Sequence, residues 1–298
     1  MIMEFLKQKN ISCITDFPLS SYSTLKIGGI GRLGIFPSNE AELCDVINFL
    51  NETNEKYALI GRGSNVLFPD ERLETILIFT EKLTEAEFDG EIIRASAGSS
   101  LTSLARGAAK HNLSGLEFAY GIPGSLGGAV YMNAGAYGSE MSDVIQSVRA
   151  YCSREKKIKE FSLNECDFSY RHSVFQNGGD LTVISAALLL TKCESDTEIQ
   201  SKMKANMSAR TEKQPLDLPN AGSAFKRPVG HFAGKLIEDA GLKGLRIGGA
   251  AISEKHAGFI VNLGGATSAD TKALIEAVKS TVYKKFGVEL VPEIKIIE

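Results

Sequence analysis

Residues 115–138 read GLEFAYGIPGSLGGAVYMNAGAYG. Six glycines and one proline fall between Gly121 and Gly138, which is more than a single turn requires. Because glycine has no side chain, this spacing allows the main chain to lie flat against a planar ligand or a pyrophosphate group. A series of β-bulges would also use such glycines. The segment therefore predicts a ligand-binding loop, with a repeatedly bulged strand as the alternative.

A second glycine loop, at residues 61–66, reads GRGSNV and follows the apolar run YALI at 57–60. Its glycines, hydroxyl and amide would let consecutive backbone N–H groups surround a phosphate, and Arg62 would add positive charge. An ordinary loop at a strand end is equally compatible, because Gly, Ser and Asn are common turn residues. Together, the two loops predict one extended dinucleotide ligand held between two lobes.

A third glycine pattern, at residues 29–34, matches the dinucleotide fingerprint G-x-G-x-x-G. The fingerprint needs an apolar strand that ends at the first glycine and a helix that opens at the second. Here the preceding residues are rich in serine, and residues 32–36 read as a strand. We therefore predict a glycine turn leading into a strand, and no Rossmann unit.

The order of helical and strand-like patterns predicts an α+β protein with three parts. Two lobes are expected at 1–85 and 86–205, followed by a C-terminal domain at 206–298. Helices are expected at 39–50, 100–111, 194–213, 231–240 and 268–286, and strands at 32–37, 57–61, 75–79, 91–98, 144–151, 167–175, 181–191, 222–225, 248–253, 259–263 and 289–297. The C-terminal order, βαββαβ, is typical of a ferredoxin-like or split βαβ sandwich.

Composition and charge exclude several classes of function. The 298 residues carry a formal net charge of −3 and no block of like charges, so no nucleic-acid partner is expected. The longest largely apolar run, 181–190, is too short to cross a bilayer, and no signal peptide precedes it, so we expect a cytoplasmic protein without a membrane partner. The five cysteines lack metal-site spacing, and no metal is expected.

Three positions carry side chains that could take part in catalysis: the pair Tyr170-Arg171, Ser223 and Glu293. Each also has a plain structural interpretation. Arg171 could be a cation on a strand surface, Ser223 a hydroxyl in a turn, and Glu293 a solvent-facing residue of a strand. None of the hydrolase or nucleotide-binding motifs H-E-x-x-H, G-x-S-x-G or Walker A occurs. From the residues alone, the plain interpretation is favoured for each position.

Six motifs in order change that balance. They are GRGSNVL (61–67), the glycine segment 115–138, FSYRHSVF (168–175), KQPLDLPNAGSAFKRP (213–228), GLKGLRIGGAAISEKHAGFIVN (241–262) and VPEI (291–294). In this order they resemble the UDP-N-acetylenolpyruvoylglucosamine reductases, also called UDP-N-acetylmuramate dehydrogenases or the MurB family. The resemblance extends from about Ser20 to residue 298. It implies a two-lobed FAD-binding region of the vanillyl-alcohol-oxidase type and a C-terminal substrate domain.

The resemblance also implies which residues contact ligands. Noncovalent FAD contacts are expected at Gly61, Arg62, Gly63, Ser64, Asn65, Val66, Gly121, Ile122, Pro123, Gly124, Ser125, Gly127, Gly128, Asn133 and Gly135. Substrate contacts are expected at Tyr170, Lys213, Lys226, Arg227 and His256. A tyrosine-bearing insertion found in the better-known branch of the family is missing after Arg171, so the chain resembles the shorter branch.

The reaction implied by the resemblance is the reduction of UDP-N-acetylglucosamine enolpyruvate, a step in peptidoglycan precursor synthesis, by a monomeric enzyme. Hydride passes from NADPH to FAD and then to the substrate, which leaves negative charge beside the substrate carboxylate. Motif position makes Ser223 the proton donor and places Arg171 and Glu293 at the enolate. A guanidinium suits that charge. A second anion would repel it, so Glu293 is expected to be protonated, hydrogen-bonded to Arg171 or part of a proton relay.

Two other functions use the same patterns. An FAD-dependent oxidase of a hydroxy acid or sugar would keep both glycine loops and would not need Ser223. A catalytically silent nucleotide-sugar binding protein would need none of Arg171, Ser223 and Glu293, and all three stand where the family motifs place them.

Overall fold

The computed structural model describes residues 1–298 and divides them into two compact units. Unit 1 consists of residues 1–14, 34–62 and 76–209, and unit 2 consists of residues 15–33, 63–75 and 210–298. Each unit is therefore assembled from three separate segments of the chain. The division into 1–85, 86–205 and 206–298 stays a prediction, and the observed units cut across its first range.

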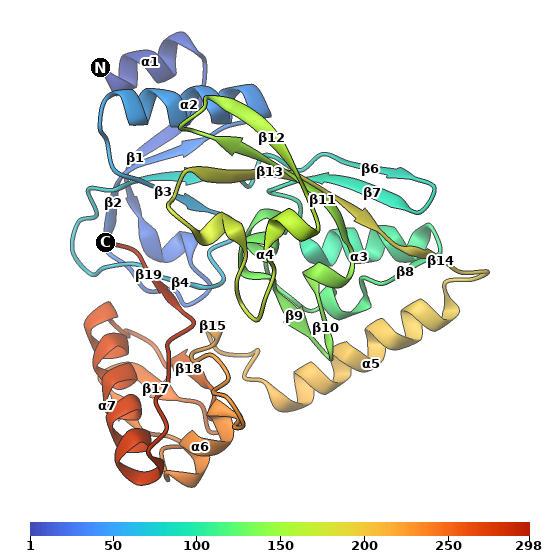
Figure 1. Cartoon of the computed structure of the whole chain (residues 1–298). Helices are drawn as coiled ribbons and strands as arrows, with labels where there is room; N and C mark the ends of the chain where they lie inside the picture. Colours follow the sequence, from blue (N-terminus) through green and yellow to red (C-terminus); the bar gives the residue numbers. More distant parts are fainter. The chain divides into compact units, whose positions relative to one another are not determined.

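The first sheet has the strand order β1-β2-β5-β3 (Figure 1). Its strands are β1 (Ser12–Pro18), β2 (Ile30–Phe36), β3 (Tyr57–Ile60) and β5 (Ile76–Phe79). Strands β2 and β3 run parallel to β5, which is buried along its whole length, as expected for an apolar central strand. Helix α2 (Glu40–Glu52) begins after Asn39, whose side chain accepts a hydrogen bond from the Glu42 N–H at 2.9 Å.

The second sheet lies in unit 1, is antiparallel and has the order β12-β11-β13-β7-β6. Its strands are β6 (Ala86–Asp89), β7 (Ile92–Ser96), β11 (Ile145–Cys152), β12 (Lys157–Ser162) and β13 (Leu181–Leu189). Helix α3 (Leu101–Lys110) buries Leu101, Leu104, Ala105 and Ala108, the spacing of one helix face. Helix α4 (Leu126–Met132) packs against β7 and β13 (Figure 1).

The third sheet lies in unit 2 and has the antiparallel order β15-β18-β17-β16. The elements of this region are β15 (Asn220–Ser223), α6 (Ala233–Asp239), β16 (Arg246–Ile247), β17 (Ala250–Ile252), β18 (Phe259–Asn262) and α7 (Ser268–Phe286). The two expected helices and the expected strands near 222, 250 and 260 are present, but the observed order is βαβββα, because the short strand β16 precedes β17. Leu25, Ile27 and Leu67 join the hydrophobic core of this region.

The last predicted strand, 289–297, needs correction. Only β19 (Lys295–Ile296) is a strand, and it pairs in parallel with β4 (Val66–Leu67) instead of joining the third sheet. Proline has no N–H to donate to a strand ladder, and Pro292 makes only an isolated bridge, with Phe225.

Two further expectations can be compared with the structure. The prediction of a strand at 167–175 is wrong, because this run contains a turn in which Ser169 and His172 form an isolated bridge. The glycine turn expected at 29–34 is wrong, because Ile30 to Gly34 are part of β2. A β-carbon at Gly31 would lie 2.7 Å from the Phe17 ring, so packing explains that glycine.

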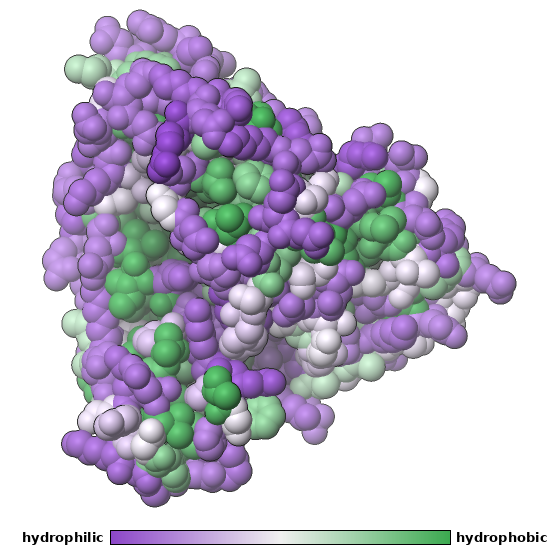
Figure 2. Space-filling model, in the orientation of Figure 1, coloured by the Kyte–Doolittle hydropathy of each residue, from purple (hydrophilic) through white to green (hydrophobic).

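Several elements complete the chain. They are α1 (Ile2–Gln8), α5 (Thr197–Lys213), β8 (Leu113–Ser114), β9 (Gly135–Ala136), β10 (Ser139–Glu140), β14 (Thr191–Lys192) and five short 3-10 helices, Leu19–Tyr22, Glu117–Ala119, Met141–Asp143, Asn164–Cys166 and Val174–Gln176. None of the helices combines the length and the apolar composition that a membrane crossing needs. Hydrophilic atoms cover most of the face drawn in Figure 2, and hydrophobic patches interrupt them.

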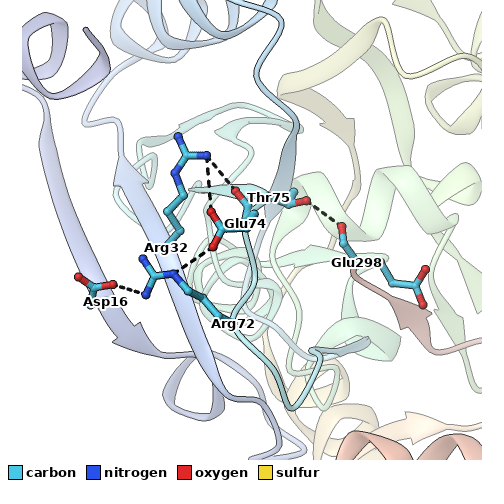
Figure 3. Close-up of polar contacts among 6 residues, drawn as sticks. All are labelled: Asp16, Arg32, Arg72, Glu74, Thr75 and Glu298. Atoms are coloured by element: carbon cyan, nitrogen blue, oxygen red, sulfur yellow. Dashed lines mark hydrogen bonds and ion pairs between the residues drawn. The ribbon is translucent and has the colours of Figure 1, made fainter.

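A polar network in unit 2 fastens residue 298 to the segment that precedes β5 (Figure 3). The Thr75 Oγ1 donates a hydrogen bond to the Glu298 carbonyl oxygen at 2.7 Å. The Arg72 Nε donates to the Glu74 carboxylate at 3.0 Å, and the Arg72 guanidinium also pairs with Asp16. Two segments from opposite halves of the sequence are thereby held together inside one unit.

The first prediction tests the core of unit 2. Leu274 on α7 is fully buried, so Leu274→Ala removes packed methyl groups and leaves a cavity. We expect it to lower the free energy of unfolding by about 2–5 kcal/mol in urea titrations. Lys284→Ala, at an exposed position on the same helix, should change that free energy by less than about 0.5 kcal/mol. Equal effects of the two variants would show that Leu274 does not lie in the core.

Candidate active site

The two glycine loops meet within unit 1 at Gly61 and Ser125. A β-carbon at Gly61 would lie 2.2 Å from the Ser125 Oγ, so a side chain there would have to displace Ser125. Ser125 is the residue before α4, and its Oγ accepts a hydrogen bond from the Gly128 N–H at 3.4 Å. The structure therefore brings together the two segments that were predicted to share one ligand.

The first turn of α4 is tied into the protein through its backbone. The Leu126 N–H donates to the Ser99 carbonyl oxygen at 2.8 Å, and the Gly127 N–H donates to the Ala97 carbonyl oxygen at 2.7 Å. A β-carbon at Gly127 would lie 2.8 Å from the Ala97 Cβ. Gly127 therefore has a packing role, and its predicted contact with FAD stays a prediction.

In unit 2, the second half of the GRGSNV loop is fixed by Gly63 and Asn65. Gly63 has a φ of +62°, and a β-carbon there would lie 1.9 Å from the Tyr22 carbonyl oxygen. The Asn65 Nδ2 donates to the Glu293 carbonyl oxygen at 3.2 Å, and the Lys295 N–H donates to the Asn65 carbonyl oxygen at 3.0 Å. Asn65 thus holds the segment from Glu293 to Lys295, a role that the sequence did not reveal.

Ser223 and Glu293 are neighbours in unit 2. Phe225 and Pro292 form an antiparallel bridge, and beside it the Glu293 N–H donates to the Ala224 carbonyl oxygen at 2.8 Å. Ser223, the last residue of β15, directly precedes Ala224 in the sequence and is exposed. Two of the three predicted catalytic residues are therefore brought to adjacent backbone segments.

Positive charge gathers beside this pair. The Lys226 N–H donates to the Val291 carbonyl oxygen at 2.8 Å, on the far side of the same bridge. Burial lowers the pKa of Lys295, and the charge of Lys226 lowers it further, while the Glu293 carboxylate acts in the opposite direction. The Lys295 ammonium therefore partly offsets the charge of Glu293.

The other predicted substrate contacts in unit 2 have different surroundings. Burial lowers the pKa of His256, so the imidazole favours its neutral form. Its Nδ1 accepts a hydrogen bond from the Gly258 N–H at 3.0 Å, which assigns the ring proton to Nε2. The Arg227 guanidinium lies 4.6 Å from the centre of the Phe232 ring, and Lys213 is exposed at the end of α5.

Arg171 lies in unit 1 on the turn between Ser169 and His172. It has a φ of +56°, which is uncommon for a residue with a side chain. Its guanidinium donates to the carbonyl oxygens of Asn133 and Gly135 at 3.5 and 3.3 Å and lies 5.1 Å from the centre of the Tyr170 ring. The structure thus brings Arg171 together with Asn133 and Gly135, which were predicted to contact FAD.

The remaining predicted ligand contacts lie in these same loops. Arg62 is exposed, Ser64 and Val66 flank Asn65, and Gly121, Ile122, Pro123 and Gly124 lead into α4. Nowhere in the chain do three or more His, Cys, Asp or Glu side chains group as they would around a metal ion. The ligand contacts and the catalytic roles remain predictions that the geometry has located.

Comparisons with known proteins agree with this organisation. Residues 32–159 match a family described as FAD binding domain, and residues 214–297 match the UDP-N-acetylenolpyruvoylglucosamine reductase C-terminal domain. The two matches confirm the predicted α+β fold class, in which an FAD-binding region precedes a C-terminal domain.

Relatives that match nearly the whole chain are named UDP-N-acetylenolpyruvoylglucosamine reductase. A UDP-N-acetylenolpyruvoylglucosamine reductase from Caldicellulosiruptor bescii is 44% identical over 98% of this chain and 93% of that protein. One from Streptococcus pneumoniae is 42% identical over 94% of this chain and 92% of that protein. The crystal structure of the Thermus caldophilus enzyme of this name has a TM-score of 0.80 at 32% identity and covers 97% of this chain and 99% of that chain. The chain therefore belongs to the UDP-N-acetylenolpyruvoylglucosamine reductase family.

Proposed function

We propose that the chain is an FAD-dependent oxidoreductase that uses NADPH to reduce the enolpyruvyl group of UDP-N-acetylglucosamine enolpyruvate. The product is UDP-N-acetylmuramate, a precursor of peptidoglycan, and the enzyme acts as a cytoplasmic monomer. Membership of the family supports the substrate and the reaction. The observation that carries the mechanism is the adjacency of Ser223 and Glu293 across the bridge between Phe225 and Pro292.

The residues of the glycine loops fit a flavin. Without a side chain at Gly61, the 61–66 loop lies directly against Ser125 of the other glycine segment, and a β-carbon at Gly63 would collide with the Tyr22 backbone. FAD would be held without a covalent bond by the 61–66 loop and by the segment from Gly121 to Gly135. When bound, FAD supplies a group that accepts hydride from NADPH and donates it to the substrate.

Arg171 serves the anionic stage of the reaction. Addition of hydride to the enolpyruvyl methylene leaves negative charge on the neighbouring carbon and its carboxylate. The guanidinium is held by the carbonyl oxygens of Asn133 and Gly135, so it does not need to reorganise as that charge develops. A preorganised cation of this kind lowers the energy of the transition state.

Ser223 delivers the proton that completes the reaction, from its Oγ to the carbon beside the substrate carboxylate. A hydroxyl is a weak acid, so the transfer relies on the basicity of the carbanion and on close positioning. Glu293, whose N–H donates to the Ala224 carbonyl oxygen next to Ser223, relays the replacement proton. Lys295, which interacts with the Glu293 carboxylate, limits the repulsion between Glu293 and the substrate anion.

Cationic and polar groups of unit 2 bind the substrate. Lys213, Lys226 and Arg227 pair with its phosphates and carboxylate. His256, neutral with its proton on Nε2, donates one hydrogen bond.

The visible spectrum of the FAD-loaded protein tests this proposal under anaerobic conditions. NADPH should bleach the flavin bands, and UDP-N-acetylglucosamine enolpyruvate should restore them. Recovery only with oxygen would favour the oxidase alternative. A protein that cannot be loaded with FAD would overturn the proposal.

The second prediction concerns Ser223→Ala. The variant should bind FAD and be reduced by NADPH at the wild-type rate, whereas its steady-state turnover should fall by about 100-fold or more. Stopped-flow absorbance measures reduction, and NADPH consumption measures turnover. Ser280→Ala, an exposed serine on α7, is the matched control and should behave as wild type. Unchanged turnover in Ser223→Ala would exclude its role as proton donor.

The third prediction concerns Gly61→Val. The added side chain must displace Ser125, so we expect the Kd for FAD to rise by about tenfold or more, a loss of about 1.4 kcal/mol of binding free energy. Flavin fluorescence titration of the FAD-free protein measures this constant. Gly90→Asn is the control, because Gly90 has a φ of +59° with open space around it and asparagine tolerates that conformation. An unchanged Kd in Gly61→Val would remove Gly61 from the flavin site.

A further inference from the structure

We propose that Gln176 and Asn133 are positioning residues that hold the Arg171 turn in its productive conformation. This inference rests on the proposed function, in which Arg171 stabilises the substrate anion. It assigns the Asn133 side chain to the protein instead of to FAD. Gln176 and Glu140 thereby gain roles that follow from the hydrogen bonds around the turn.

The turn itself has few internal restraints. The Ser169 N–H donates to the His172 carbonyl oxygen at 3.2 Å, and the His172 N–H donates to the Ser169 carbonyl oxygen at 3.0 Å. Between them, Arg171 adopts a φ of +56°, which a residue with a β-carbon leaves readily unless its surroundings oppose the change. Additional contacts therefore have to stabilise this conformation.

Two side-chain amides supply those contacts, one on each side of the turn. The Asn133 Nδ2 donates to the Ser169 carbonyl oxygen at 3.1 Å. The Gln176 Nε2 donates to the Arg171 carbonyl oxygen at 3.1 Å and to the Tyr131 carbonyl oxygen at 2.7 Å. The Ser169 carbonyl group, before the left-handed residue Arg171, and the carbonyl group of Arg171 itself are thus both restrained. These restraints fix the direction in which the Arg171 side chain leaves the backbone.

Asn133 is itself fixed. It is fully buried, with a φ of +42° at the end of α4. Its Nδ2 also donates to the Glu140 carboxylate at 2.8 Å, and its Oδ1 accepts from the Ser142 N–H at 3.0 Å. The donor and the acceptor of the Asn133 side chain are therefore both hydrogen-bonded within the protein. The backbone carbonyl oxygen of Asn133 accepts from the Arg171 guanidinium.

One connected network results, in which Asn133 contacts both the turn, at Ser169, and the guanidinium of Arg171. Asn133 holds the turn through its side chain and the guanidinium through its backbone. Gln176 holds the turn from the opposite side, and Glu140 orients the Asn133 amide by accepting its hydrogen bond. Loss of either amide should release the backbone of the turn and misplace the guanidinium without removing it.

The fourth prediction uses Gln176→Leu, which keeps the size of the side chain and removes both hydrogen bonds. Reduction of the flavin by NADPH should be unchanged, whereas its anaerobic reoxidation by UDP-N-acetylglucosamine enolpyruvate should slow by roughly 10- to 100-fold. In an Arg171→Ala background, Gln176→Leu should slow reoxidation no further, because there is no guanidinium left to misplace. Stopped-flow absorbance measures both half-reactions.

A second readout does not need the flavin. In the FAD-free protein, the amide of His172 should exchange with deuterium faster in Gln176→Leu than in wild type. Asn133→Asp, which replaces the donor facing Glu140 and Ser169 with an acceptor, should show the same effect. The control is Asn48→Leu, since Asn48 also uses its side chain for a hydrogen bond in unit 1, with Tyr151, away from the turn. It should leave the His172 amide and both half-reactions unchanged.

Equal slowing of both half-reactions, additive losses with Arg171→Ala or unchanged exchange at His172 would each overturn the inference. Failure of the proposed function looks different, because the wild-type flavin would then not be reoxidised by the enolpyruvyl substrate. Exchange at His172 would in that case still decide whether Gln176 holds the turn.

Discussion

The burial of Leu25, Ile27 and Leu67 in the core of the C-terminal region is the constraint on which unit 2 depends. These side chains come from two early segments of the chain, and they pack with residues that lie about two hundred positions later. The parallel pairing of β4 with β19 and the hydrogen bond from Asn65 to Glu293 follow from this packing. The position of Glu293 is therefore set by residues near the start of the sequence.

Local patterns predicted α2, α3, α5, α6 and α7 because their information is local, but they missed α1 and also α4, which lies within the segment predicted as a glycine loop. The spacing of Leu101, Leu104 and Ala105 defines one face of α3, and Ser100 and Asn39 mark where helices begin. The partner of β19 was not predictable, because a two-residue strand carries no pattern that names its neighbour. The run FSYRHSVF alternates like a strand, but the left-handed conformation of Arg171 turns it back on itself.

In the candidate site, too, some residues could be predicted from the sequence, whereas others could be found only from the three-dimensional structure. Motif resemblance led to Ser223, Glu293 and Arg171, and the structure located them. It did not lead to Gln176, whose amide acts on a carbonyl group five residues away, because an isolated glutamine has no diagnostic spacing. Glycines were ambiguous for a related reason: Gly61 faces the other glycine loop, whereas Gly31 and Gly127 serve packing.

The discontinuous make-up of unit 2 has a consequence for how the protein folds. Leu25, Ile27 and Leu67 emerge from the ribosome early, but some of their core partners, Leu290 and Ile294 among them, are synthesised more than 200 residues later. Closing such long loops slows folding, and apolar segments without partners favour aggregation during synthesis. The nascent chain therefore has to keep its first core residues shielded, by transient contacts or by a chaperone, until residues 290–297 are available.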